Sequence, residues 1–97
     1  MAVRFEWDEN KNRTNIAKHG IGFAAVIPVF EDPLALTLLD RAVGGEARYR
    51  TVGVSSDGVL LVAHTLVELS EDDELIRIIS ARHATSSERK AYEEGEY

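Results

Sequence analysis

The pattern of apolar and polar residues at the start of the chain predicts a strand followed by a helix. Residues 2–7 alternate between apolar and charged positions, which is typical of a strand with one buried face. The inward side chains are predicted to be Val3, Phe5 and Trp7. Asp8 is a good N-cap for a helix over residues 9–18, and Gly20 marks the end of that helix as a left-handed residue.

The middle of the chain predicts a second, short helix and then a run of strands. The apolar residues 23–29 favour a helix, although Pro28 lacks the amide hydrogen that an interior helical position needs. Residues 31–33 form a connection, and Ser-Asp-Gly at residues 56–58 is a strong hairpin turn signal. The predicted strands cover residues 34–39, 47–55, 59–67 and 74–82, with a loop over residues 40–46 between the first two.

A capping box predicts a short helix at the end of the chain. Thr85 is the expected N-cap, Glu88 follows at the third helical position, and the helix runs to residue 94 before Gly95 closes it. This order of elements implies an α+β fold: an antiparallel β-sheet with two N-terminal helices packed on it and a short C-terminal helix. With 97 residues, 44% of them hydrophobic, the chain fits a single domain over residues 1–97.

Composition excludes several kinds of chemistry. Cysteine is absent, which removes disulfides, thiol nucleophiles and cysteine-ligated metal sites. The three histidines, His19, His64 and His83, lack the spacing of a helical metal site, so we expect no metal and no cofactor. The N-terminus has no signal-peptide pattern and no segment reaches transmembrane length, so we expect a cytoplasmic protein without a membrane partner.

The charges are segregated along the chain. The formal net charge of −6 argues against indiscriminate binding of nucleic acid, which depends on neutralising phosphates. The acidic residues are concentrated at residues 71–74 and 93–96, however, and many of the basic ones lie elsewhere. These basic residues are Arg41, Arg48, Arg50, Arg77, Arg82, Arg89 and Lys90. A local basic surface is therefore compatible with the acidic total.

The segment over residues 77–84 is the most informative part of the chain. Arg77 and Arg82 flank an apolar strand pattern, where a guanidinium group lies either at the solvent edge or against an anion such as phosphate. Period-two alternation places the two arginines on opposite faces unless a bulge intervenes. Most surface arginines are solvated or paired with acidic residues. Before other observations, we therefore give this alternative the same weight as a phosphate site.

Two more arginines and a histidine lie on neighbouring predicted strands. Arg48 and Arg50 share one strand face with Val52 and Val54, an arrangement that is useful around a polyanion. His64 shares a face with apolar residues, where a histidine is more often a hydrogen-bonded core residue than a catalyst.

Brought together on one sheet surface, these arginines and His64 would suit phosphate-ester cleavage, in which cations stabilise charge and the histidine moves a proton. RNA supplies its own nucleophile, the ribose 2′-hydroxyl, so a ribonuclease needs neither a metal nor a covalent catalyst. Glu46 and Glu88 are the carboxylate options for the base, although Glu88 already has a structural role in the capping box.

Motifs spread over nearly the whole chain resemble the BrnT toxin family. They are Phe5-Glu6-Trp7-Asp8-Glu9, Lys11, Asn15, Lys18-His19-Gly20-Ile21, Phe23, Val29-Phe30, Asp32, Glu46-Ala47-Arg48, Gly53, Arg77-Ile78-Ile79-Ser80-Ala81-Arg82, Ala84, Glu88-Arg89 and Tyr92. The resemblance implies a RelE-like ribonuclease fold and a toxin of a type II toxin-antitoxin system that cleaves RNA and arrests translation. It also implies a BrnA antitoxin of the ribbon-helix-helix type, a two-plus-two heterotetramer, and repression of promoter DNA through contacts that the antitoxin makes.

The resemblance also assigns expected site residues. Arg48, Arg77 and Arg82 are placed at the phosphate or transition state, with Lys18 and His19 as substrate contacts. Arg50, from the strand argument, and Arg89 complete the expected substrate contacts. His64 is an acid or base on the strand argument alone. One alternative is a non-catalytic domain whose basic surface receives an acidic or amphipathic antitoxin segment within a repressor complex, which the net charge of −6 favours. Another is a small structural domain without a polyanion site.

Overall fold

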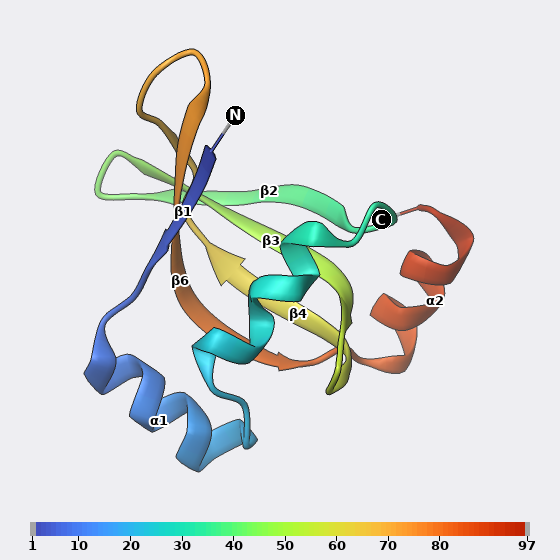
Figure 1. Ribbon diagram of the computed structural model, residues 1–97. Helices are drawn as coiled ribbons and strands as arrows, with labels where there is room; N and C mark the ends of the chain where they lie inside the picture. The colour runs from blue at the N-terminus through green and yellow to red at the C-terminus, as the bar shows by residue number, and fades with distance from the viewer. Residues whose placement is uncertain (1, 97) are drawn as a thin grey trace.

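The computed structural model describes residues 2–96 and shows an α+β fold, as predicted (Figure 1). Met1 and Tyr97, which the predicted domain over residues 1–97 includes, lie outside the described residues. The strands are β1 (Ala2–Glu6), β2 (Leu36–Val43), β3 (Glu46–Ser55), β4 (Gly58–His64), β5 (Val67–Glu68) and β6 (Asp73–His83). The helices are α1 (Glu9–His19), the 3₁₀ helix η1 (Phe23–Glu31) and α2 (Ser86–Glu94).

The six strands form one mixed sheet in the order β1-β6-β4-β3-β2, and β5 pairs with β6 outside this path. Every described pairing is antiparallel except that of β1 with β6, which is parallel. The prediction of a purely antiparallel sheet is therefore wrong. The first and last strands meet after the chain has passed through α1, η1 and the β2–β4 meander, and a connection of that length permits a parallel pair.

Several predicted boundaries also change. Helix η1 runs to Glu31, into the expected connection, and β2 begins at Leu36 instead of residue 34. The expected loop over residues 40–46 is a tight turn, because β2 continues to Val43 and Gly44-Gly45 alone connects it to β3. Both glycines have positive φ, 58° and 81°, as a two-residue hairpin turn requires. The predicted strand over residues 59–67 ends at His64, and Val67–Glu68 forms the separate strand β5.

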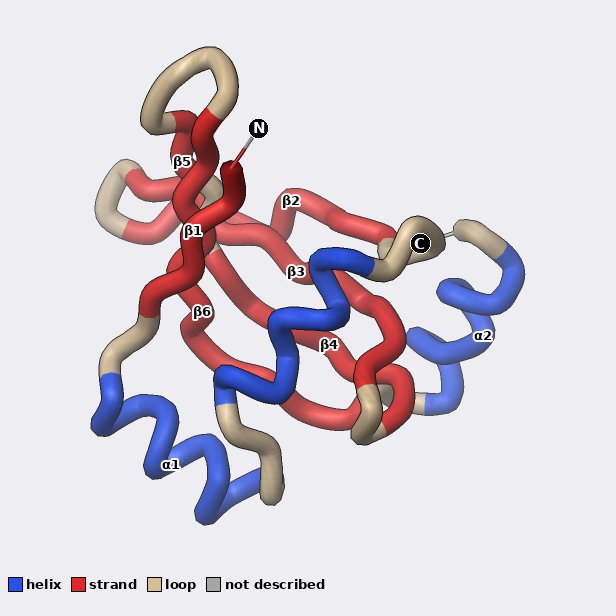
Figure 2. The backbone as a smooth tube through the Cα atoms, in the orientation of Figure 1, coloured by secondary structure: helices blue, strands red, loops and turns tan. Residues whose placement is uncertain are grey.

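The main core lies between one face of the sheet and η1, which crosses that face in Figures 1 and 2. Its buried residues are Ile21, Phe23, Val26, Val29, Leu60, Val62, Ile76, Ile78 and Ala81. Phe5 and Trp7 pack against this cluster as predicted, but Val3 is 43% exposed on the edge strand. We call this side of the sheet the η1 face.

Gly53 of β3 allows η1 to lie very close to the sheet. A Cβ atom at this position would come within 3.0 Å of Val29 Cγ1 and 3.1 Å of the Val29 carbonyl oxygen. Ala35 Cβ would be only 3.2 Å away. A side chain at residue 53 would therefore push the end of η1 away from the strand.

Helix α1 does not pack on a sheet face as predicted but along the free edge of β6. The Asn15 side chain of α1 is buried, and its amide group pairs with the backbone of β6 on the edge where no neighbouring strand within residues 2–96 does so. The Nδ2 group donates to the carbonyl oxygens of Ala81 and Ile21, both at 2.9 Å, and Oδ1 accepts from the Ala81 amide at 3.1 Å. Because buried backbone groups need partners, Asn15 lets β6 continue beyond the end of β1.

Helix α2 covers one end of the sheet's other face, near Val52, Leu61 and Ala84. The predicted capping box is present: Thr85 and Glu88 satisfy each other's backbone amides. The Tyr92 hydroxyl donates to Asp32 at 2.6 Å, which ties α2 to the segment after η1. That hydrogen bond raises the pKa of Tyr92 to about 12. Within residues 2–96, no helix has the length and apolar character needed to cross a membrane.

Replacing Asn15 with alanine should lower the free energy of unfolding by about 2–4 kcal/mol, because it leaves buried backbone groups of Ala81 and Ile21 unpaired. Urea denaturation followed by Trp7 fluorescence measures the change. Asn10→Ala is the matched control, since Asn10 is exposed in the same helix, and its effect should stay within about 0.5 kcal/mol. Equal losses in the two variants would contradict the role given to Asn15.

Candidate functional site

A one-residue bulge in β6 places Arg77 and Arg82 on the same face of the sheet. The pairing with β4 shifts between Ala63, opposite Ser80, and His64, opposite Ile78. The extra residue inverts the alternation, so that Ile78 and Ala81 both lie in the core on the η1 face. Arg77 and Arg82 therefore both lie on the opposite face, which settles the alternation that the sequence left open.

Arg48 and Arg50 of β3 lie on this same face. Arg50 is opposite Ala63, and Ala63 is opposite Ser80, so these three residues form a row across β3, β4 and β6. Arg48 pairs with Arg41 of β2, which adds a further cation. We call this surface the arginine face, and its cations are Arg41, Arg48, Arg50, Arg77 and Arg82.

The middle of the arginine face is lined by small residues. Ala63 and Ser80 lie between Arg50 on one side and the outer edge of β6 on the other. Neighbouring strands are about 4.8 Å apart, so two strand spacings separate the backbones at Arg50 and Ser80 by about 10 Å. An extended polyanion fits over this floor with cationic side chains on both sides.

Acidic residues at the rim partly neutralise the arginine face. Arg77 Nε lies 3.5 Å from Glu6, and Arg50 Nε lies 3.7 Å from Asp40. The second distance is too long for a hydrogen bond. Within the described part of the chain, the buried Nε atoms of Arg48 and Arg50 have no hydrogen-bond partner. Buried donors of this kind are costly unless an acceptor is supplied, which suits an anionic ligand.

Arg82 is held by a fork of two hydrogen bonds to Glu88, at 2.8 and 3.0 Å. This interaction is the main reason why the pKa of Glu88 falls to about 2. The same carboxylate accepts the Thr85 amide at 2.9 Å. Glu88 is thus a structural anion and a very weak base, whereas Glu46 lies on the arginine face two positions before Arg48.

His64 lies on the η1 face and not with the arginines. The side chain is buried, and its two ring nitrogens lie 2.7 Å from Thr51 Oγ1 and 2.9 Å from the Thr65 carbonyl oxygen. The Phe30 ring packs edge-on against it. Burial lowers the pKa of His64, so the neutral ring is favoured. The expectation that His64 joins the arginines on one surface is wrong, and the structure favours the alternative of a core histidine.

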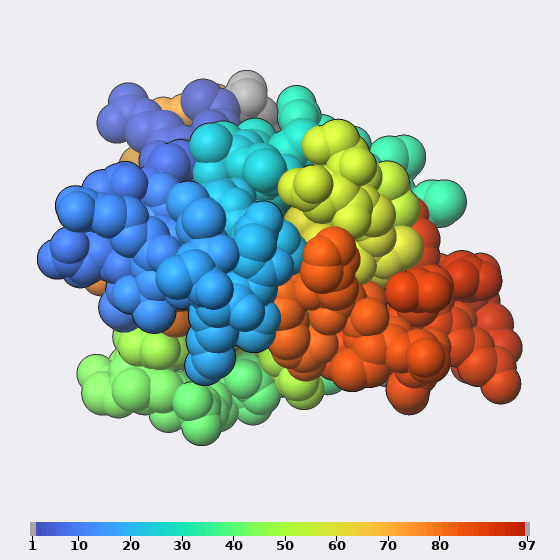
Figure 3. All heavy atoms as spheres, turned by 90° about the horizontal axis from the view of Figure 1, so that it is seen from below, coloured from blue at the N-terminus to red at the C-terminus, as the bar shows by residue number. Residues whose placement is uncertain are grey.

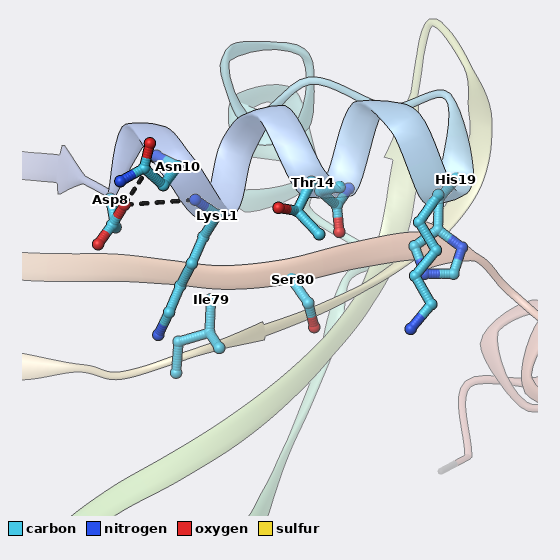
Figure 4. A pocket seen from close by; sticks show the side chains of 9 residues that line it. Asp8, Asn10, Lys11, Thr14, His19, Ile79 and Ser80 are labelled. Carbon is cyan, nitrogen blue, oxygen red and sulfur yellow. Dashed lines mark hydrogen bonds between the residues drawn. The ribbon is translucent and has the colours of Figure 1, made fainter.

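A cavity of about 290 Å³ lies between α1 and β6, at the border of the arginine face (Figure 4). Its lining residues are Asp8, Asn10, Lys11, Thr14, Asn15, Lys18, His19, Ile79 and Ser80. The predicted substrate contacts Lys18 and His19 are thus brought beside the arginine face. Arg89, the remaining predicted contact, is exposed on α2 and does not line this cavity.

The sequence did not single out Lys11, Thr14 or Ser80 as members of a site. The spacing of Lys11, Thr14 and Lys18 on one side of α1 was a usable signal, because residues three and four apart lie on one helix face. What was missing was the position of α1 along the edge of β6. Among the residues that the structure describes, no group of three or more His, Asp or Glu side chains is arranged to hold a metal ion.

Comparison with protein families identifies the chain. A family model described as "Ribonuclease toxin, BrnT, of type II toxin-antitoxin system" matches residues 7–88, which is most of the sequence. The chain belongs to the BrnT family. This BrnT protein is therefore assigned to the ribonuclease toxins of type II toxin-antitoxin systems, and such a toxin has an antitoxin partner. A search of curated proteins finds no significant match.

The buried His64 should make this BrnT protein less stable as the pH falls below 6.5. The unfolded chain binds a proton at the ordinary histidine pKa of 6.5, whereas the folded chain binds it only at lower pH, so protonation favours unfolding. The free energy of unfolding should lose up to about 1.4 kcal/mol per pH unit from this residue. His64→Gln should remove that part of the slope between pH 7 and 5 in urea denaturation.

His83→Gln is the control for this measurement, because His83 is exposed near the end of the same sheet. This variant should keep the slope of the parent protein. Identical slopes in the parent and His64→Gln would contradict the assignment.

The Glu88 carboxylate should stabilise the fold most above pH 4.5 and progressively less as the pH falls toward 2, because folding lowers its pKa. The shift corresponds to roughly 3 kcal/mol, and the 36% exposure of the Arg82 side chain reduces the expected loss in Glu88→Gln at pH 7 to about 1–2 kcal/mol. The loss should be smaller at pH 3. Glu93→Gln, an exposed change on the same helix, should have little effect at either pH.

Proposed function

We propose that this BrnT protein is a metal-independent endoribonuclease that holds RNA on the arginine face. The observation that carries the proposal is the β6 bulge, which places Arg77 and Arg82 on the same sheet face as Arg48 and Arg50. Cations on one sheet face around a floor of small residues suit a sugar-phosphate backbone, and phosphate contacts position a nucleic acid. Membership of a ribonuclease toxin family supports the same activity.

In the proposed reaction, the ribose 2′-oxygen attacks the neighbouring phosphorus while the bond from phosphorus to the 5′-oxygen breaks. The 2′-hydroxyl proton passes to a base, and the leaving 5′-oxygen takes a proton from water. The products are a 2′,3′-cyclic phosphate and a 5′-hydroxyl end. Arginines stabilise the negative charge on the phosphoryl oxygens, since preorganised donors are most effective where charge develops.

The residues of the arginine face take distinct roles in this proposal. Arg48, Arg77 and Arg82 contact the reacting phosphate, and Arg50 contacts the flanking strand. Glu46 is the carboxylate that receives the 2′ proton, because it shares the face of Arg48 and its side chain has no partner within residues 2–96. Lys18 and His19 extend the RNA contacts onto α1, and Arg89 adds charge from α2.

The proposed partner is a BrnA-type antitoxin with a ribbon-helix-helix domain, in a two-plus-two heterotetramer. In this arrangement the toxin is neutralised and promoter DNA is contacted through the antitoxin. The net charge of −6 supports that division of roles, because it disfavours direct DNA binding by the toxin. RNA cleavage by the free toxin would arrest translation in the cytoplasm, and the sheet with its arginine face supports a RelE-like arrangement.

A non-catalytic domain that acts within a repressor complex is the second candidate. It is favoured by the rim acids, because Glu6, Asp40 and Glu88 already lie beside three of the arginines. In this alternative, the arginine face binds an acidic segment of the antitoxin. The two candidates differ in what happens to RNA when the purified toxin is present alone.

Incubation with bulk RNA in a chelator should produce fragments with 2′,3′-cyclic phosphate ends, which end-labelling and mass spectrometry identify. Arg48→Ala and Arg82→Ala should lower the cleavage rate about 100-fold or more, the size of effect seen when one charge-stabilising donor is removed. Arg48→Ala is the cleaner variant, because Arg82 also supports Glu88.

The matched control is Arg13→Ala, which removes the same charge from the side of α1 opposite Lys11. This variant should cleave at the parent rate. Intact RNA with the parent protein, both alone and with ribosomes, would contradict the ribonuclease proposal and favour the non-catalytic candidate. Equal losses of cleavage rate in all three variants would contradict the assignment of the active site to the arginine face.

A further inference from the structure

We infer that the cavity between α1 and β6 is a pocket for one nucleotide of the RNA strand that lies on the arginine face. This inference rests on the proposed ribonuclease function. It adds a recognition site beside the arginine face and assigns roles to Lys11, Thr14, Asn10 and Ser80.

The cavity continues directly from the arginine face. Ile79 and Ser80 line it, and these two residues lie in the middle of the stretch of β6 between Arg77 and Arg82. Ser80 also ends the row that begins at Arg50. A strand of RNA that contacts Arg50 and Arg82 therefore passes the mouth of the cavity.

The charges of the cavity suit a phosphodiester. Lys11 and Lys18 lie two helical turns apart on the side of α1 that faces β6, about 10 Å apart along the helix axis. Neither lysine has an acidic partner within the described residues, whereas Arg50, Arg77 and Arg82 each lie beside a carboxylate. Asp8, the one acidic residue of the lining, is held at the N-cap of α1, where its Oδ1 accepts the amides of Asn10 and Lys11.

The uncharged groups of the cavity suit a base. Asn10, Thr14 and Ser80 offer amide and hydroxyl groups that have no hydrogen-bond partner elsewhere in residues 2–96, and together they can donate to and accept from a base edge. Ile79 gives an apolar surface for the flat face of the ring. Figure 4 shows Lys11 extending from α1 toward Ile79, with Thr14 on the side of Ser80.

The size of the pocket suits a small ligand. Pockets for drug-sized ligands have volumes of about 300–1,000 Å³, and this open pocket, at 290 Å³, has room for a single nucleotide whose outer part stays in solvent. A base enters such a pocket only when it is unpaired, and sequence-specific RNA recognition largely uses unpaired bases of this kind. The cavity therefore predicts a preference for single-stranded RNA and for the base that fits it.

The test is titration of the ¹⁵N-labelled protein with each of the four nucleoside monophosphates and, separately, with inorganic phosphate. At least one nucleotide should shift the amide signals of Thr14, Ile79 and Ser80 in a saturable way, and phosphate should not reproduce these shifts. The double change Lys11→Gln with Lys18→Gln should weaken that binding about tenfold, equivalent to 1.4 kcal/mol. Thr14→Val, which keeps the side-chain shape, should weaken it and alter the preference among bases.

Arg13→Gln is the control and should bind nucleotides as the parent does. Shifts confined to residues around Arg48 and Arg50, or equal shifts with phosphate alone, would overturn the inference. The measurement needs no RNA cleavage, so the two proposals can fail separately. If RNA is cleaved in chelator but no nucleotide binds in the cavity, the nucleotide-pocket inference is wrong and the ribonuclease proposal stands. If nucleotides bind but RNA is not cleaved, the ribonuclease proposal is wrong and the nucleotide site stands.

Discussion

The arrangement of charge on this protein depends on one irregularity in the pairing of β4 with β6. Without the extra residue between Ile78 and Ser80, alternation along β6 would place one of its two arginines on the η1 face, where the core lies. With it, the apolar residues on both sides of the bulge face η1, and Arg77 and Arg82 share the other surface. Bulges commonly redirect side chains near functional sites, and here the bulge separates the apolar from the cationic side of the sheet.

The local features of the fold could be predicted from the sequence, because they depend on residues close together in the chain. The Asp8 cap, the Gly20 helix end and the Thr85–Glu88 capping box each need only the preferences of one turn of backbone. The shared face of Arg48 and Arg50 follows from alternation along one regular strand.

The remaining features depend on contacts between distant segments. Nothing in the residues around Ile79 marks a bulge, since this is an ordinary strand residue whose irregularity arises from the packing of both halves of β6 against η1. The parallel pairing of β1, the edge position of α1 and the burial of His64 likewise require knowledge of which elements meet. The arginines of the candidate site were therefore predictable as residues, but their common surface and the cavity beside it were not.

Gly53 shows how a position without a side chain can govern a distant surface. Its missing Cβ lets the Val29 backbone approach β3, and this approach sets where Asp32 stands at the end of η1. Asp32 accepts hydrogen bonds from the Val54 amide of β3 and from the Tyr92 hydroxyl of α2. Glu88, in the first turn of the same helix, holds Arg82. The distance between β3 and η1 at Gly53 is thus linked, through Asp32 and α2, to the position of Arg82 on the arginine face. Substitutions in the core and on the arginine face are therefore not independent.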